Sequence, residues 1–247
     1  LPTEILGSIL EMTYDIEQDQ ECSTEQGPNH AEHLLTLASV SSRFLSVVID
    51  TATLWAVADW RCSPAQLKKC LERSRGALVA VKYNLPEEHT REQVRVSLRR
   101  LISEDFFGDL GRWRDADLFI DSGRMLVTLS KLAAPQLRRV VIKYFAPPTR
   151  EPIHLFRGNA PNLRMIDLAG IHVHWEWSQD VIANLRSLVL SAVKISEASV
   201  LSFLSVIKLS SILQKLVIRL VSWGDTVDLP AIAPSRLNSL KEIVITG

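Results

Sequence analysis

Apolar residues recur at two different spacings along the chain, and the change of spacing divides it into two parts. In the first ten residues the apolar positions are 1, 5, 6, 9 and 10, the spacing of one helix face, and Pro2 is tolerated in a first helical turn. A second helical pattern runs from His33 to Ile49, where Ser41-Ser42 predicts a break and a cap for a further helix. Beyond residue 60 the spacing becomes that of short strands.

The two helical patterns are separated by a polar, acidic stretch. Residues Asp15 to His30 hold few apolar side chains, and Gly27-Pro28-Asn29 breaks any helix there. We therefore predict an acidic loop over residues 14–33 within a helical module that ends near residue 60.

The second part of the chain, residues 61–247, contains an internal repeat. Its six-residue unit is apolar at the first, fourth and sixth positions, in the pattern Leu-x-x-Leu-x-Leu. Successive units start 26, 22, 28 and 27 residues apart, and weaker copies start at Leu78 and Trp113. One copy would mean little in a chain so rich in apolar residues, whereas five at near-even intervals indicate a repeat architecture. The clear copies are 137–142, 163–168, 185–190, 213–218 and 240–245.

Each unit predicts one short strand whose fourth and sixth side chains point inward, because strand side chains alternate between two faces. A helix or loop then returns the chain, and stacked units bury what one unit alone cannot. Thr90–Ser103 is predicted as one such returning helix, with Thr90 and Gln93 forming a capping box. The expected fold class is therefore α/β, a helical module followed by an irregular solenoid with a curved parallel sheet.

Charge follows the same division. Residues 1–42 carry eight acidic residues and no Lys or Arg, so the remainder holds 28 basic against 20 acidic residues and is +8. That mild excess does not predict nucleic-acid binding, which usually needs a clustered basic stripe. No apolar run reaches the roughly 18 residues of a membrane span. The chain starts at Leu1, inside a motif, so we expect it to be a fragment.

Candidate chemistry is sparse. The three cysteines, Cys22, Cys62 and Cys70, contain no Cys-x-x-Cys pair, which argues against a disulfide framework or zinc knuckle and fits a cytoplasmic or nuclear protein. His172, His174 and Glu176 would share one face of an extended segment, as in a metal site, but a fourth ligand is missing. Phosphate-binding and nucleophile motifs are also missing. We expect no enzyme activity and no cofactor.

The opening Leu-Pro-Thr-Glu-Ile-Leu, the later Val-Ser-Ser-Arg-Phe and the closing Leu54-Trp55 together resemble the F-box domain. The resemblance covers about the first 60 residues. Two departures from the family pattern stand out, since Ser41-Ser42 replaces a frequent cysteine and the acidic loop lengthens the first connection. An F-box followed by leucine-rich repeats is a common layout of the family, although the repeats here have no Asn or Cys at the ladder position, where Ile171 stands after Leu168.

The resemblance implies a substrate receptor of a Skp–cullin–F-box ubiquitin ligase. Its helical module would bind the Skp adaptor, and through it a cullin scaffold, while the repeats would hold a protein target. The alternative is a repeat scaffold whose degenerate F-box no longer binds the adaptor. The adaptor contacts carried over from the family are Leu1, Pro2, Ile5, Leu6 and Ile9, with Val40, Arg43, Phe44, Val48, Leu54 and Trp55 shared between contact and core.

The repeats themselves predict where a target would bind. The third, fifth and seventh positions of each unit should point out of the strand face, and the fifth-position column reads Val, Asp, Val, Val, Val. An apolar strip with basic neighbours is typical of an interaction site for an apolar and acidic protein segment. An element covering the strip, or simple strand propensity of valine, explains the column equally well. The predicted target-binding residues are Arg139, Val141, Lys143, Asp167, Val189, Lys215, Val217 and Arg219.

Overall fold

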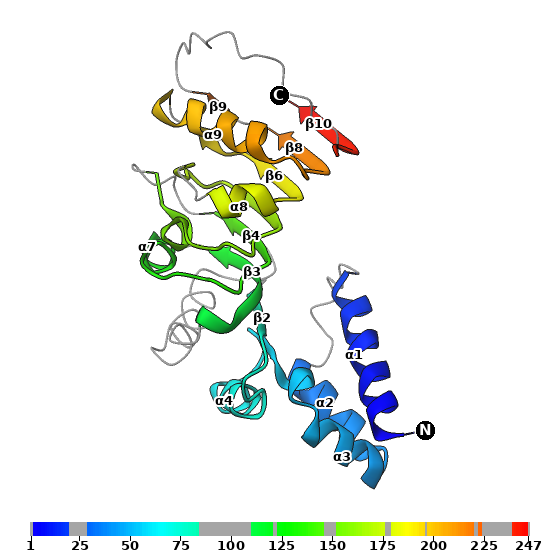
Figure 1. The fold of residues 1–247 in the computed structure, drawn as a ribbon. Coiled ribbons are helices and arrows are strands. Elements are labelled where there is room, and N and C mark those ends of the chain that lie inside the picture. The colour runs from blue at the N-terminus through cyan, green and yellow to red at the C-terminus, as the bar shows by residue number, and fades with distance from the viewer. Residues whose placement is uncertain are drawn as a thin grey trace. The chain divides into compact units, whose positions relative to one another are not determined.

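The computed structural model describes residues 2–19, 29–83, 110–120, 123–145, 152–175, 179–195, 197–219, 222–223 and 239–246. The chain divides into two units, Leu1–Ser103 and Glu104–Gly247. Both combine helices with parallel strands, so the fold class is α/β (Figure 1). None of the helices within these ranges is long and apolar enough to cross a membrane.

The first unit begins with helices. They are α1 (Thr3–Asp19), α2 (His30–Ser39), α3 (Ser42–Asp50) and the short 3₁₀ helix η1 (Ala52–Trp55). The strand β1 (Val57–Asp59), the helix α4 (Pro64–Arg73) and the strand β2 (Val79–Tyr83) follow, and β1 pairs with β2 in parallel. This unit therefore extends past residue 60, because α2 also contacts β1 and α4.

Local sequence explains where these helices start. Asn29 caps α2 and forms a capping box with Glu32, while Ser41 caps α3 by accepting from the backbone N–H of Phe44 at 3.2 Å. The predicted break at Ser41-Ser42 is thus confirmed. The predicted loop over 14–33 is wrong at both ends, since α1 continues to Asp19 and α2 starts at His30. Polar residues such as Glu and Gln are good helix formers, so loss of apolar character does not end a helix.

The second unit holds six parallel strands in chain order, β3-β4-β5-β6-β8-β10. Figure 1 shows the strands of this sheet side by side from green to red. The predicted arrangement of the five clear repeat units as neighbouring parallel strands is confirmed, with each strand beginning two residues into its unit. Both weaker copies also form strands. The six strands are β3 (Trp113–Ile120), β4 (Arg139–Tyr144), β5 (Met165–Ala169), β6 (Ser187–Ser191), β8 (Lys215–Arg219) and β10 (Glu242–Thr246).

The connections between these strands differ in type and length, as expected for irregular repeats. They include α7 (Gly123–Lys131), the short η3 (Leu155–Gly158), α8 (Gln179–Asn184) and α9 (Glu197–Leu209), of which α8 and α9 contact each other. The short strands β7 (Lys194–Ile195) and β9 (Ser222–Trp223) pair in parallel and form a second, two-stranded sheet. The helix predicted over 90–103 falls outside the described residues.

The register aligns equivalent positions of the repeat units. Val140, Ile166, Leu188, Leu216 and Ile243 are partners across five strands, as are the sixth-position residues. The first four units bury both positions to 8% exposure or less, which confirms the inward prediction for them. The last unit is different, with Ile243 57% and Ile245 67% exposed, because β10 pairs only with β8 among the described strands.

Asparagine side chains and one glycine fix the turns between the strands. Asn162 donates its side-chain amide to the Pro135 carbonyl at 2.8 Å, and Asn184 donates to the Pro161 carbonyl at 3.0 Å. Asparagine side chains therefore link successive turns, but each asparagine stands one residue before the first Leu of its unit and not at the ladder position of the family pattern. Gly170 has φ +71, and a Cβ there would lie 2.2 Å from the Tyr144 carbonyl oxygen, so this turn requires glycine.

Candidate protein-interaction site

The helices α1, α2 and α3 share an apolar core that the closing Leu-Trp completes. Leu34 and Val47 are fully buried, and Leu54 and Trp55 are 3% and 4% exposed. The indole Nε1–H of Trp55 donates to the Val48 carbonyl at 2.6 Å, which ties η1 to α3. A side-chain hydrogen bond from Thr53 to Glu11 ties η1 to α1 as well.

His30 makes a further link in this core. Its Nε2 lies 2.6 Å from the Leu54 carbonyl, to which the neutral ring donates. Burial lowers the pKa of His30 to about 4, although the carbonyl and the nearby Asp59 act in the opposite direction. The ring is therefore neutral at physiological pH and serves as a structural donor.

The opposite faces of the same helices leave apolar side chains in water. On α1, Ile5, Ile9 and Met12 are 47%, 44% and 59% exposed and lie at the i, i+4, i+7 spacing of one face. The other face of α1 buries Leu6 and Leu10. The remaining exposed apolar residues are Leu35 and Val40 on or beside α2, and Leu45 and Ile49 on α3. We call these seven residues the helical apolar surface.

Several exposed apolar side chains on neighbouring helices are typical of a protein-binding surface, whereas scattered single ones need no explanation. α1 contacts α3, and α3 contacts α2, so the surface belongs to helices that pack on one another. A helix with apolar residues on two faces indicates two packing partners, and the described residues supply only one of them.

The predicted adaptor contacts divide between surface and core. Pro2, Ile5, Ile9, Val40 and Arg43 are exposed, and Phe44 is partly exposed. Leu6 was predicted as a contact, but at 9% exposure it lies in the core, because it is on the face of α1 that packs inward. Val48, Leu54 and Trp55 are core residues too, and Leu1 lies outside the described residues.

Sequence reasoning missed Met12, Leu35, Leu45 and Ile49. The signal was present, since α3 contains five apolar residues in Arg43–Asp50, more than one buried face can use. The contacts carried over from the family resemblance did not include these four residues.

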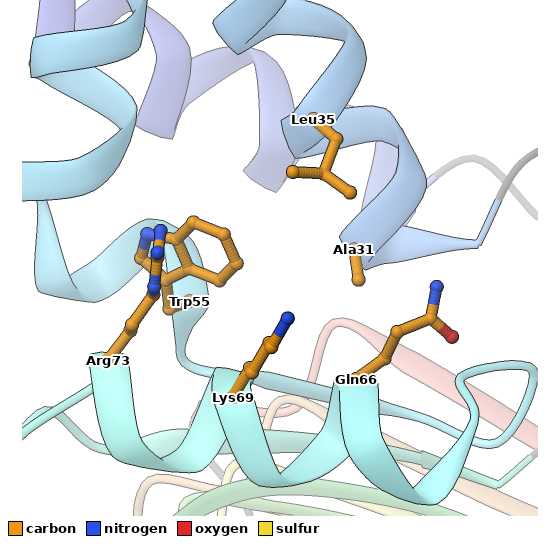
Figure 2. A pocket seen from close by; sticks show the side chains of 6 residues that line it. All are labelled: Ala31, Leu35, Trp55, Gln66, Lys69 and Arg73. Carbon is orange, nitrogen blue, oxygen red and sulfur yellow. The ribbon is translucent and has the colours of Figure 1, made fainter.

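A small cavity of about 100 Å³ lies beside this core, between α2 and α4 (Figure 2). Trp55 and Arg73 form one wall, where the guanidinium lies 4.5 Å from the ring centroid in a cation–π contact. Leu35, which is part of the helical apolar surface, lies on the opposite side. The cavity is lined by Ala31, Leu35, Trp55, Gln66, Lys69 and Arg73.

The thiols and carboxylates nearby do not form a reactive centre. Burial raises the pKa of Cys70 to about 12, so this thiol is protonated at neutral pH and a poor nucleophile. The buried Asp59 is satisfied by Arg61, whose Nη2 lies 2.6 Å from its Oδ2. Hydrogen bonding to Asp59 raises the pKa of Arg61 further.

The histidine segment of the second unit does not assemble a metal site from the residues that the structure describes, which contain no group of three metal-ligating side chains. His172 is buried, and burial lowers its pKa. His174 stacks on His154 with ring centroids 4.1 Å apart. Glu176 lies outside the described residues.

The predicted apolar strip on the sheet is not open to solvent. Val141, Val189 and Val217 are 4%, 9% and 1% exposed, so the expectation of an exposed fifth-position column is wrong for them. Long basic side chains at the third and seventh positions of the units flank Val141 and Val217, whereas the short Ser187 and Ser191 flank Val189. Of the other predicted residues, Arg139, Lys143, Asp167 and Lys215 are partly exposed and Arg219 is exposed.

An aromatic and basic cluster replaces the strip at the carboxyl ends of β3 and β4. The Nζ of Lys143 lies 4.9 Å from the Phe119 ring centroid, and Phe119 packs against Phe145, which is 61% exposed. Both phenylalanines were missed, because Phe119 belongs to a weak repeat copy and Phe145 follows its unit. Burial raises the pKa of Asp167, with Lys143 opposing this shift.

Comparison of the chain with protein-family models, curated proteins and solved structures gives no significant match.

Proposed function

We propose that this chain is a non-catalytic substrate receptor of a Skp–cullin–F-box ubiquitin ligase, acting in the cytoplasm or nucleus. Its helices α1–α3 would act as an F-box-like module that binds the Skp adaptor, and through it a cullin. The repeat strands of the second unit would form an irregular leucine-rich-repeat solenoid that holds a protein target. The alternative is a repeat scaffold that does not bind the adaptor.

The observation that carries the proposal is the helical apolar surface. Ile5 and Ile9 on α1 and Val40 at the end of α2, which the family resemblance assigns to adaptor contact, are exposed at 44–64%. An isolated domain gains nothing from leaving such side chains in water, whereas burial of each against a partner contributes on the order of 1 kcal/mol or more.

The core beneath this surface agrees with the same assignment. The closing Leu54-Trp55 is buried and hydrogen-bonded to α2 through His30 and to α3 through Val48. The motif residues are thus divided into a set that builds the module and a set that faces outward. This division supports a binding module better than plain helix packing, in which both sets would be buried.

Calorimetric titration of the full chain with purified Skp adaptor tests the proposal. Ile5→Asp/Ile9→Asp should abolish binding, because it places two charges in the apolar contact surface. Both side chains are exposed, so their replacement should leave the core of the module intact. Val127→Asp/Leu201→Asp is the matched control, since these residues of the second unit are 48% and 56% exposed. If Ile5→Asp/Ile9→Asp keeps wild-type helicity and still binds the adaptor with wild-type affinity, the proposed contact surface is wrong and the scaffold alternative is favoured.

A further inference from the structure

A row of basic side chains crosses the sheet of the second unit at the second position of its repeat units. It starts with Arg114, the second residue of β3, and continues through Arg138, Arg164 and Arg186 to Lys241, with only Gln214 interrupting it. We call these residues, without Gln214, the basic column. Lys and Arg make up 28 of the 247 residues, about one in nine, yet they fill five of the six positions of this row.

Backbone hydrogen bonds place these residues directly next to one another. The N–H of Arg138 donates to the Arg114 carbonyl at 2.7 Å, and those of Arg164 and Arg186 donate to the preceding arginine of the column at 2.8 Å. Gln214 and Lys241 continue the same ladder. Neighbouring strands are about 4.8 Å apart, so the column has one residue at each such step across the sheet.

The fold does not require these charges. The ladder uses only backbone atoms, and Gln214 shows that a neutral residue fits the position. Arg138, Arg164 and Arg186 are exposed, and no described carboxylate pairs with them, although Arg114 pairs with Asp115 at 2.7 Å. Like charges this close lie within one Debye length and repel each other, so the column lowers stability unless an anionic partner offsets the repulsion.

We propose that the basic column binds an acidic helical segment of another protein. A helix rises about 5.4 Å per turn, so Glu or Asp side chains repeated every turn would meet the column at about one carboxylate per strand. Four of the five residues are arginines, whose planar guanidinium group binds carboxylates in a bidentate manner. If the chain is a substrate receptor, as proposed above, this segment belongs to the target protein.

Single-stranded nucleic acid is the other polyanion to weigh against this partner. Its binding sites generally combine basic residues with aromatic side chains on which bases stack. The column contains no aromatic residue, and Trp113, which precedes Arg114, is buried. The geometry and composition therefore favour carboxylates on a protein.

The test uses the full chain and three fluorescent probes. One is an alanine-based helical peptide of about 20 residues with Glu at every turn of one face. The second has the same composition with Glu spread around the helix, and the third is a 20-nucleotide single-stranded DNA. The column variant is Arg138→Gln/Arg164→Gln/Arg186→Gln. The matched control, Lys131→Gln/Lys194→Gln/Lys208→Gln, removes the same charge from exposed sites elsewhere in this unit.

The one-face peptide should bind wild type at least tenfold more tightly than the spread peptide. The column variant should lose at least tenfold in affinity for it, and the control variant less than twofold. Equal loss in both variants, equal binding of both peptides, or tighter binding of the DNA would each overturn the proposal. A negative result in this experiment would not bear on adaptor binding, because the adaptor titration tests residues of the first unit. The two proposals can therefore be rejected independently.

Discussion

The two units use the same kinds of residues in opposite ways. The helical unit leaves apolar side chains such as Ile9 and Val40 exposed, while its charged Asp59 is buried and paired. The sheet unit buries nearly every apolar position of its first four repeat units and exposes Arg138, Arg164 and Arg186, with which no described carboxylate pairs. The helical apolar surface would release water on binding, whereas the basic column would release ions. The two units are therefore suited to different partners.

The largest expected effect is a difference in the stability cost of truncating equivalent positions in two repeat units. Leu190→Ala should lower the free energy of unfolding of the second unit by about 3 kcal/mol, because Leu190 is fully buried at the sixth position. Ile245→Ala, at the same position of the last unit but 67% exposed, should cost less than about 0.5 kcal/mol. Hydrogen exchange of the strand amides measures both, and equal costs would contradict the account of the sheet.

The next effect is a pH dependence confined to the first unit. The pKa of His30 is about 4 in the folded state against 6.5 when unfolded, so the unfolded state binds the extra proton between these values. Stability from this group is complete above pH 6.5 and is lost as pH falls toward 4, by up to about 3 kcal/mol.

The variant His30→Gln should remove this part of the pH dependence, while His33→Gln should retain it. The comparison uses urea unfolding followed by the helical signal at pH 7 and pH 4.5. A wild-type curve that runs parallel to that of His30→Gln would show that His30 is not buried as a neutral donor.

A smaller effect concerns the closing Leu-Trp. Trp55→Phe keeps most of the ring but removes the donor to the Val48 carbonyl, leaving a buried acceptor unsatisfied. The expected loss is about 1–2 kcal/mol in the stability of the first unit. Thermal unfolding measures it, and an unchanged midpoint would mean that the hydrogen bond does not hold η1 to α3.

The smallest effect is the response of adaptor binding to salt. The helical apolar surface carries little charge, so its affinity should change less than about twofold between 50 and 300 mM NaCl. Binding of the acidic peptide to the basic column should fall about tenfold or more over the same range. Similar salt dependence for both partners would remove the distinction between the units.

The sequence predicted the elements better than their exposure. The repeat spacing located five strands and their shared register, because apolar residues recur at the first, fourth and sixth positions of units that start at near-even intervals. The helix break at Ser41 could also be predicted from neighbouring residues alone. The end of α1 could not, since helix-forming polar residues give no stop signal before Asp19.

Exposure depends on neighbours that no single strand reveals. Val141 and Val217 were expected at the surface and are buried, whereas Ile245 was expected inside and is exposed. The basic column was missed although Arg138, Arg164 and Arg186 are readable once the units are aligned. The third, fifth and seventh positions received attention because strands alternate, but the second position lies before the strand in all five clear units and follows no such rule.

The central claim is that the helical apolar surface binds the Skp adaptor, and co-elution of the two purified proteins tests it most directly. Size-exclusion chromatography with light scattering, on the full 247-residue chain mixed with adaptor, should show a one-to-one complex that persists at high salt. Two separate peaks at micromolar concentrations, with the chain folded by circular dichroism, would contradict the claim.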